Sequence, residues 1–151
     1  MRSNSPIELP ATQPSSGQRL APCSRLLVAE DDRDLRDLLV AGLRADGYDI
    51  VEVATGLELL DALMKSALAT NGHAFDLVIS DVRMPGLSGV DALAKLGHGT
   101  RAAPVLFITA FGDDEVHEQA RQAGAIDVLD KPIDIDDLRA FVAAFLAGRE
   151  R

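Results

Sequence analysis

Apolar and polar residues alternate along the chain in blocks that predict short strands separated by helices. Five apolar runs are too short for helices and are followed by turn residues, which is typical of strands. These runs are residues 26–29, 49–54, 75–80, 104–108 and 126–129. Apolar side chains recur every three or four residues between and after the runs, which predicts five helices.

The predicted helices have recognisable apolar faces and ends. Asp32 is expected to cap the first helix, and Gly47 is expected to end it. The fourth helix, roughly residues 113–123, is polar. The expected apolar positions are Leu35, Leu38, Leu39 and Leu43 in the first helix; Leu59, Leu60, Leu63, Met64 and Ala67 in the second; Val90, Leu93, Ala94 and Leu96 in the third; and Ile135, Leu138, Phe141, Val142, Phe145 and Leu146 in the last.

Strands that alternate with helices over short connections predict a parallel sheet with helices on both faces. We expect an α/β fold with a five-stranded parallel sheet flanked by five helices. The strand order 2-1-3-4-5 of flavodoxin-like proteins is chosen by analogy with other open sheets of this size.

The length of 151 residues suits one domain with a core large enough to be stable alone. Residues 1–23 contain four prolines among Ser, Asn, Gln and Thr, without apolar periodicity. We therefore expect a disordered N-terminal tail at 1–23, a folded domain at 24–148 and a short C-terminal tail at 149–151.

The net charge and the composition indicate which classes of partner and which cellular compartment to expect. A net charge of -9 with 47% hydrophobic residues predicts a soluble acidic protein that does not bind nucleic acid directly. Cys23 is the single cysteine, so the chain forms no internal disulfide. The sequence has no apolar run of membrane-spanning length and no secretory signal, which predicts a cytoplasmic protein without a membrane partner.

Charged and hydroxyl side chains follow the predicted strands. Glu30 and Asp31 follow the first strand, Asp81 the third, Thr109 the fourth and Lys131 the fifth. The carboxyl ends of these strands converge at one edge of such a sheet. Three carboxylates with no His or Cys nearby suit Mg²⁺, and a hydroxyl with an ammonium group suits phosphoryl oxygens. Each of these residues alone could instead cap a helix, start a turn or balance a charge. Their common position at one edge of the sheet favours a single site that they form together.

Four motifs in order resemble those of response-regulator receiver domains over about residues 25–147. They are Leu26-Leu-Val-Ala-Glu30-Asp31-Asp32, Asp81-Val-Arg-Met-Pro-Gly-Leu-Ser-Gly, Ile108-Thr109-Ala110 and Lys131-Pro132. The set is specific, although each motif alone is weak. The resemblance implies a phosphoacceptor at Asp81 and Mg²⁺ held by Glu30, Asp31, Asp81 and the backbone carbonyl of Arg83.

The resemblance also implies that Thr109 is the switch hydroxyl and that Lys131 contacts the phosphoryl group. Glu30 stands where the family more often has Asp, and Val128 stands where many members carry a mobile aromatic residue. We therefore expect a conformational change at the phosphorylation site to be transmitted through the Thr109 loop and Phe111.

The implied partners are a histidine kinase or phosphotransfer protein and a downstream output protein. We expect a stand-alone receiver, unless the chain is a fragment of a longer regulator, and a regulatory domain that catalyses only its own phosphorylation and dephosphorylation. The sequence leaves the oligomeric state open, including a dimer that depends on phosphorylation.

Two alternative functions remain open from the sequence. An aspartate-nucleophile phosphohydrolase would need a carboxylate where Arg83 stands, whereas a binding module independent of phosphorylation would not need the intact site.

Overall fold

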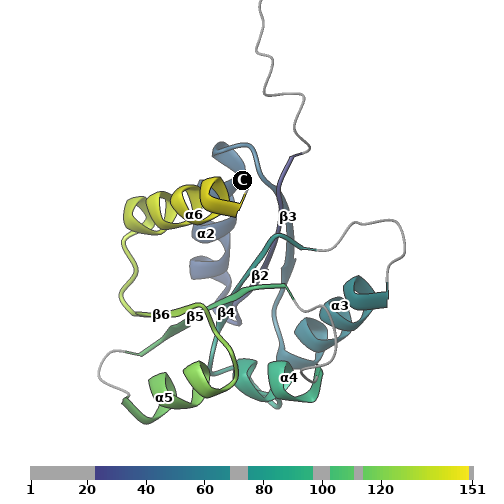
Figure 1. Cartoon of the computed structure of the whole chain (residues 1–151). Coiled ribbons are helices and arrows are strands. Elements are labelled where there is room, and N and C mark those ends of the chain that lie inside the picture. Colours follow the sequence, from purple (N-terminus) through teal and green to yellow (C-terminus); the bar gives the residue numbers. More distant parts are fainter. Residues whose placement is uncertain (1–22, 69–74, 97–102, 111–113, 150–151) are drawn as a thin grey trace, which may run out of the picture.

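A parallel β-sheet runs through the centre of the protein, and helices cover both of its faces (Figure 1). The computed structural model describes residues 23–68, 75–96, 103–110 and 114–149. In these residues the sheet has five strands in the spatial order β3-β2-β4-β5-β6, which confirms the predicted topology. The strands are β2 (Arg25–Ala29), β3 (Asp49–Val53), β4 (Leu77–Asp81), β5 (Val105–Thr109) and β6 (Asp127–Asp130).

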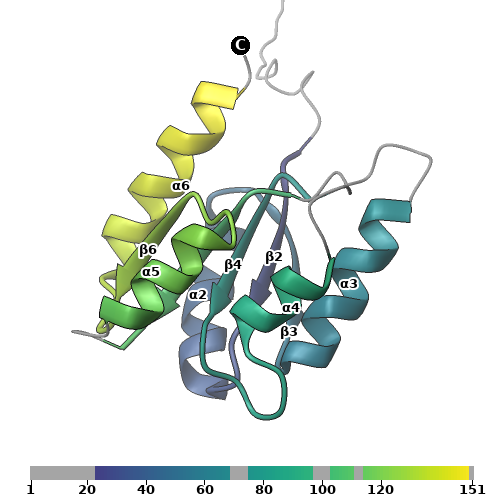
Figure 2. The ribbon, with the colours of Figure 1, turned by 60° about the horizontal axis from the view of Figure 1, so that its bottom comes forward.

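Helices form a layer on each side of the sheet (Figures 1 and 2). One layer contains α2 (Arg33–Ala45) and α6 (Ile135–Arg149). The other contains α3 (Gly56–Leu68), α4 (Gly89–Leu96) and α5 (Asp114–Gln122). None of the helices in the described ranges is both long enough and apolar enough to cross a membrane.

The central strands are buried on both faces. In β2, Leu26 and Val28 pack in the cluster under α2 and α6, whereas Leu27 and Ala29 pack in the cluster on the opposite face. Successive side chains of a strand point to opposite faces, so both sets must be apolar when helices cover both sides. Each buried Leu or Val side chain contributes about 1.5–3 kcal/mol. This double burial explains why the strands have nearly continuous apolar sequences.

The register of the strands brings their carboxyl ends to one edge of the sheet. Asp81, the last residue of β4, pairs with Ile108, and Thr109, the last residue of β5, pairs with Asp130. Glu30 directly follows β2. The predicted site residues therefore start from backbone positions at the same edge.

The ends of α2 are those predicted from the sequence. The Asp32 Oδ1 atom accepts hydrogen bonds from the backbone N–H groups of Asp34 and Leu35, at 3.0 and 3.2 Å. This pair satisfies N–H groups that have no partner inside the helix. Gly47 has a φ of +94°, a left-handed conformation that a side chain disfavours, and it follows the last turn.

Three positions predicted to face the core are exposed to solvent. Leu38 in α2 is 49% exposed, Met64 in α3 is 48% exposed, and Ala94 in α4 is also exposed. Val40 and Ala92 are buried instead. Apolar residues on these helices span a wider arc than the sheet covers, so spacing alone did not identify the buried part of the arc.

Several predictions concern residues outside the described ranges. They concern residues 1–22 and 150–151 of the predicted tails, Phe111, and Asp113 at the start of the predicted fourth helix. Cys23 lies within the described part of the chain, where its Sγ atom is 2.7 Å from the backbone oxygen of Gly47.

Candidate phosphoryl and metal site

Three acidic side chains meet at the carboxyl edge of the sheet. Glu30, Asp31 and Asp81 each have a carboxylate oxygen within 4.8 Å of one from each of the other two. Glu30 is only 1% exposed and Asp81 only 5%, whereas Asp31 is exposed. The cluster is therefore buried on the strand side and open to solvent at Asp31.

Lys131 is the cation of this cluster. Its Nζ atom lies 2.8 Å from Asp81 Oδ2 and 3.4 Å from Glu30 Oε1. Burial by itself lowers the pKa of Lys131, but the hydrogen bond and the charge of Asp81, with a smaller contribution from Glu30, raise it overall. Lys131 therefore stays protonated and offsets part of the negative charge of the acids.

The Asp81 carboxylate is held at both of its oxygens. Oδ2 is bound by Lys131, and Oδ1 accepts a hydrogen bond from the backbone N–H of Arg83 at 3.1 Å. The Ser80 hydroxyl donates to the backbone oxygen of Asp81 at 2.9 Å. These contacts fix both the side chain and the backbone at the end of β4, and they bring the Arg83 peptide beside the carboxylate.

Glu30 is buried with an incomplete set of partners. Burial raises the pKa of its carboxyl group from 4.5 to about 7, although the backbone N–H of Asp32 opposes this rise; nearby Asp81 raises the pKa further. The Asp32 N–H donates to Glu30 Oε2 at 3.0 Å, whereas Oε1 accepts no hydrogen bond. This buried oxygen therefore has the Lys131 ion pair at 3.4 Å but no hydrogen bond, and a closer cation would stabilise it.

Thr109 presents a second buried polar atom that makes no hydrogen bond. Its side chain is fully buried, and its Oγ1 atom makes no hydrogen bond. The Lys131 N–H donates to the backbone oxygen of Thr109 at 2.7 Å, which joins the ends of β5 and β6. A hydroxyl held in this way is free to donate to an acceptor that enters the site.

The residues present fit a Mg²⁺ ion. The donors are all carboxylate oxygens, which is the ligand type that Mg²⁺ prefers. Three carboxylates share the single ammonium group of Lys131 in this cluster, and Glu30 Oε1 accepts no hydrogen bond, so a further cation would be favourable here.

Two contacts near the site had no signal in the sequence. Arg36 donates from Nη1 to the backbone oxygen of Glu30 at 2.8 Å. His117 is partly buried, and its Nε2 atom is 2.6 Å from Asp130 Oδ1. Both pairs join residues of different elements, and no motif spacing connects them.

Val128 and Phe111 are the residues that the sequence connects with transmission of the phosphorylation signal. Val128 is buried and packs in the cluster that contains Phe107, Val116 and Ala120. Phe111 lies outside the described residues.

Comparison with known proteins decides the family. The chain matches the response regulator receiver domain model over residues 26–143. The chain belongs to this family. The receiver is 38% identical over 128 residues to the transcriptional regulatory protein PdtaR of Mycobacterium tuberculosis, a match that covers 84% of this chain and 58% of that protein. It is 29% identical over 122 residues to sporulation initiation phosphotransferase F of Bacillus subtilis, covering 81% of this chain and 93% of that one.

Solved structures agree with this assignment. The receiver domain of a putative LuxO repressor protein from Vibrio parahaemolyticus has a TM-score of 0.73 and 29% identity, with 85% of this chain and 94% of that chain covered. The BeF3-activated DrrB receiver domain has a TM-score of 0.69 and 25% identity, with 83% and 99% covered. The predicted resemblance is confirmed, and the receiver is a signalling domain of two-component systems. It spans 58% of the length of the first curated relatives.

Proposed function

We propose that Asp81 of this receiver accepts a phosphoryl group from a phosphohistidine of a histidine kinase or phosphotransfer protein. The observation that carries the proposal is the buried Asp81 carboxylate, bound by Lys131 at 2.8 Å in a cluster of acids. A bond forms between phosphorus and an Asp81 oxygen as the bond from phosphorus to the imidazole nitrogen breaks. The electron pair of the broken bond leaves on the imidazole.

Glu30, Asp31 and Asp81, with the backbone carbonyl of Arg83, are the proposed holders of Mg²⁺. The ion, when bound, supplies positive charge that offsets repulsion between the acids and the phosphoryl oxygens. The chain itself positions Asp81, through the Arg83 N–H and the Lys131 ammonium group. The domain thereby catalyses its own phosphorylation and the later hydrolysis of the acyl phosphate, and no other reaction.

Phosphorylation changes the partners of Thr109 and Lys131. A phosphoryl group brings a charge of about -2 to the end of β4. The unpaired Thr109 hydroxyl can donate to one of its oxygens, and Lys131 can contact another. Movement of Thr109 at the end of β5 then alters the binding of an output protein. A tenfold change in affinity needs a difference of only about 1.4 kcal/mol between the two arrangements.

The test is incubation with Mg²⁺ and acetyl phosphate, followed by intact mass measurement. We expect one stable phosphoryl adduct on the parent and none on Asp81→Asn. Rapid turnover of the donor without an adduct would indicate a phosphohydrolase instead. The absence of both turnover and adduct would indicate a binding module that does not use phosphorylation.

A further inference from the structure

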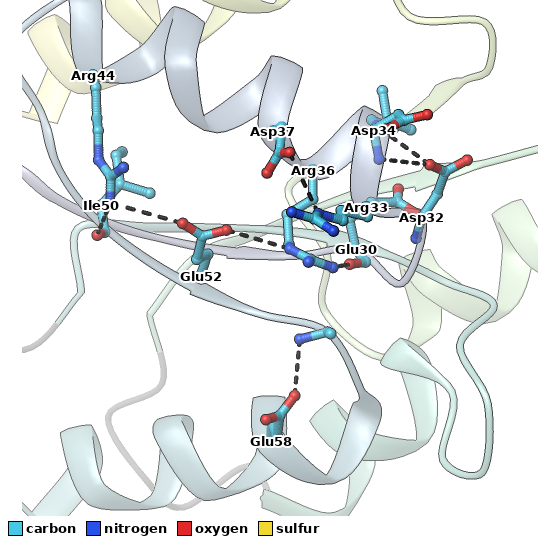
Figure 3. Close-up of polar contacts among 12 residues, drawn as sticks. Glu30, Asp32, Arg33, Asp34, Arg36, Asp37, Arg44, Ile50, Glu52 and Glu58 are labelled. Carbon is cyan, nitrogen blue, oxygen red and sulfur yellow. Dashed lines mark hydrogen bonds and ion pairs between the residues drawn. The ribbon is translucent and has the colours of Figure 1, made fainter.

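Arg36 ties the start of α2 to the acidic end of β2 (Figure 3). Its Nη1 atom donates to the backbone oxygen of Glu30 at 2.8 Å, and its Nε atom lies 3.3 Å from Glu52 Oε1. The side chain is only 17% exposed. One guanidinium group therefore holds a backbone carbonyl of the site and a carboxylate of β3 at the same time.

The contact with Glu30 fixes a peptide that both acids of the site share. The Glu30 carbonyl belongs to the peptide that links Glu30 to Asp31, so its direction sets how the two side chains leave the backbone. On the other side of the residue, the Glu30 N–H donates to the backbone oxygen of Val53 at 3.1 Å. Arg36 and β3 together hold Glu30 on both sides.

Glu52 gives Arg36 an acidic partner outside the metal cluster. Its other carboxylate oxygen, Oε2, lies 3.8 Å from Arg44 Nη2, and Arg44 also donates to the backbone oxygen of Ile50 at 3.5 Å (Figure 3). The charge of Arg36 is thus balanced by Glu52 rather than by the carboxylate of Glu30 or Asp31. An arginine that paired with those carboxylates would compete with a metal ion for them.

We propose that Arg36 is a positioning residue, which orients the Glu30–Asp31 peptide so that both carboxylates meet Asp81 in a geometry that binds Mg²⁺. This inference rests on the proposed function, because it concerns the same metal site. The planar guanidinium group donates in two fixed directions, which the single ammonium group of lysine does not reproduce.

Three variants distinguish a role of Arg36 in positioning the metal ligands from a role in folding stability alone. Arg36→Met removes the contacts with Glu30 and Glu52. Arg36→Lys keeps the positive charge but lacks the planar guanidinium group that donates in two directions. Arg44→Met is the matched control, since it removes an ion pair with Glu52 but touches neither acid of the site. Folding stability is measured by urea unfolding without metal, and Mg²⁺ affinity is measured by calorimetry.

We expect Arg36→Met to raise the Kd for Mg²⁺ about tenfold, or about 1.4 kcal/mol, and Arg44→Met to change it less than about twofold. Arg36→Lys should remain impaired. Equal effects of Arg36→Met and Arg44→Met on the Kd, or none from Arg36→Met, would overturn the proposal. If Arg36→Met does not fold, the comparison of Arg36→Lys with Arg44→Met decides it.

A metal-free measurement keeps this test distinct from the proposed function. The Asp32 N–H donates to Glu30 Oε2 at 3.0 Å, so its amide exchange reports the position of the Glu30 side chain. We expect about tenfold faster exchange in Arg36→Met, and parent-like exchange in Arg44→Met. Unchanged exchange would contradict the positioning role. A parent that binds Mg²⁺ but takes no phosphoryl group would contradict only the proposed function.

Discussion

Glu30 shows how one buried residue sets the pH response of the site. Burial raises the pKa of its carboxyl group to about 7, so the folded protein binds this proton more tightly than the unfolded chain does. Without metal, the stability that protonated Glu30 contributes is present below about pH 4.5 and is lost as the pH rises through about 7.

We predict that Glu30→Gln removes this part of the pH dependence. Urea unfolding of both proteins at several pH values from about 5 to 8, without metal, should show a stability difference that grows with pH in favour of the glutamine variant. A difference that is constant with pH would contradict the raised pKa. In the parent, Mg²⁺ affinity should fall as the pH drops below about 7, because the proton competes with the ion for Glu30.

Asp31 differs from Glu30 because its side chain is exposed to solvent. We predict that Asp31→Ala weakens Mg²⁺ binding by about tenfold or more while leaving the free energy of unfolding nearly unchanged. Asp34→Ala, an exposed acid in the first turn of α2, is the control. Parent-like affinity in Asp31→Ala, measured by calorimetry, would remove Asp31 from the proposed metal ligands.

At the scale of elements, the start of α4 must lie very close to the end of β4. A Cβ atom at Gly89 would lie 2.5 Å from the backbone oxygen of Asp81, 2.8 Å from Ser80 Oγ and 2.9 Å from Phe107 Cε1. The Gly89 N–H also donates to the backbone oxygen of Val82 at 2.8 Å. A side chain at Gly89 therefore forces the helix away from the strand that carries Asp81.

We predict that Gly89→Ala destabilises the protein by about 1–3 kcal/mol, as overpacking does in other cores. It should also slow phosphoryl uptake, because Asp81 loses its fixed backbone. Gly148→Ala in α6 is the matched control, since a Cβ atom there meets nothing within 4 Å. Urea unfolding and intact mass after acetyl phosphate treatment measure the two effects. Equal behaviour of the two variants would show that the close approach is not required.

At the scale of the whole molecule, the proposed route of the phosphorylation signal starts from Thr109 at the end of β5. Val128 in β6 is buried but has a small side chain, so it cannot make the large movement available to an aromatic ring. We therefore propose that the signal passes through Thr109 and Phe111.

We predict that Phe111→Ala keeps phosphoryl uptake nearly intact but reduces the phosphorylation-dependent change around α5. Val128→Ala should reduce that change much less. Amide exchange across residues 109–128, with and without a phosphoryl mimic, compares the three proteins. If the parent and Phe111→Ala respond equally, backbone movement of the Thr109 loop carries the signal without Phe111.

The sequence by itself determined the order of elements and the type of chemistry at the edge of the sheet. Strand runs and helix caps such as Asp32 depend on residues close in sequence, so local patterns identify them. The parallel arrangement then brings Asp81, Thr109 and Lys131 to one edge, because each follows or ends a strand.

The tertiary structure decided what local patterns do not contain. The exposure of Leu38 and Met64 depends on which arc of each helix the sheet covers. The burial of Glu30, and the lack of a hydrogen bond to its Oε1 atom, depend on how closely other elements surround it. Arg36 reaches Glu52 on β3 through packing of α2 beside the sheet, and no spacing of residue types predicts that contact. Contacts between distant segments form only when the whole core assembles, so the sequence named the acids of the site but not the arginine that donates to the Glu30 backbone oxygen.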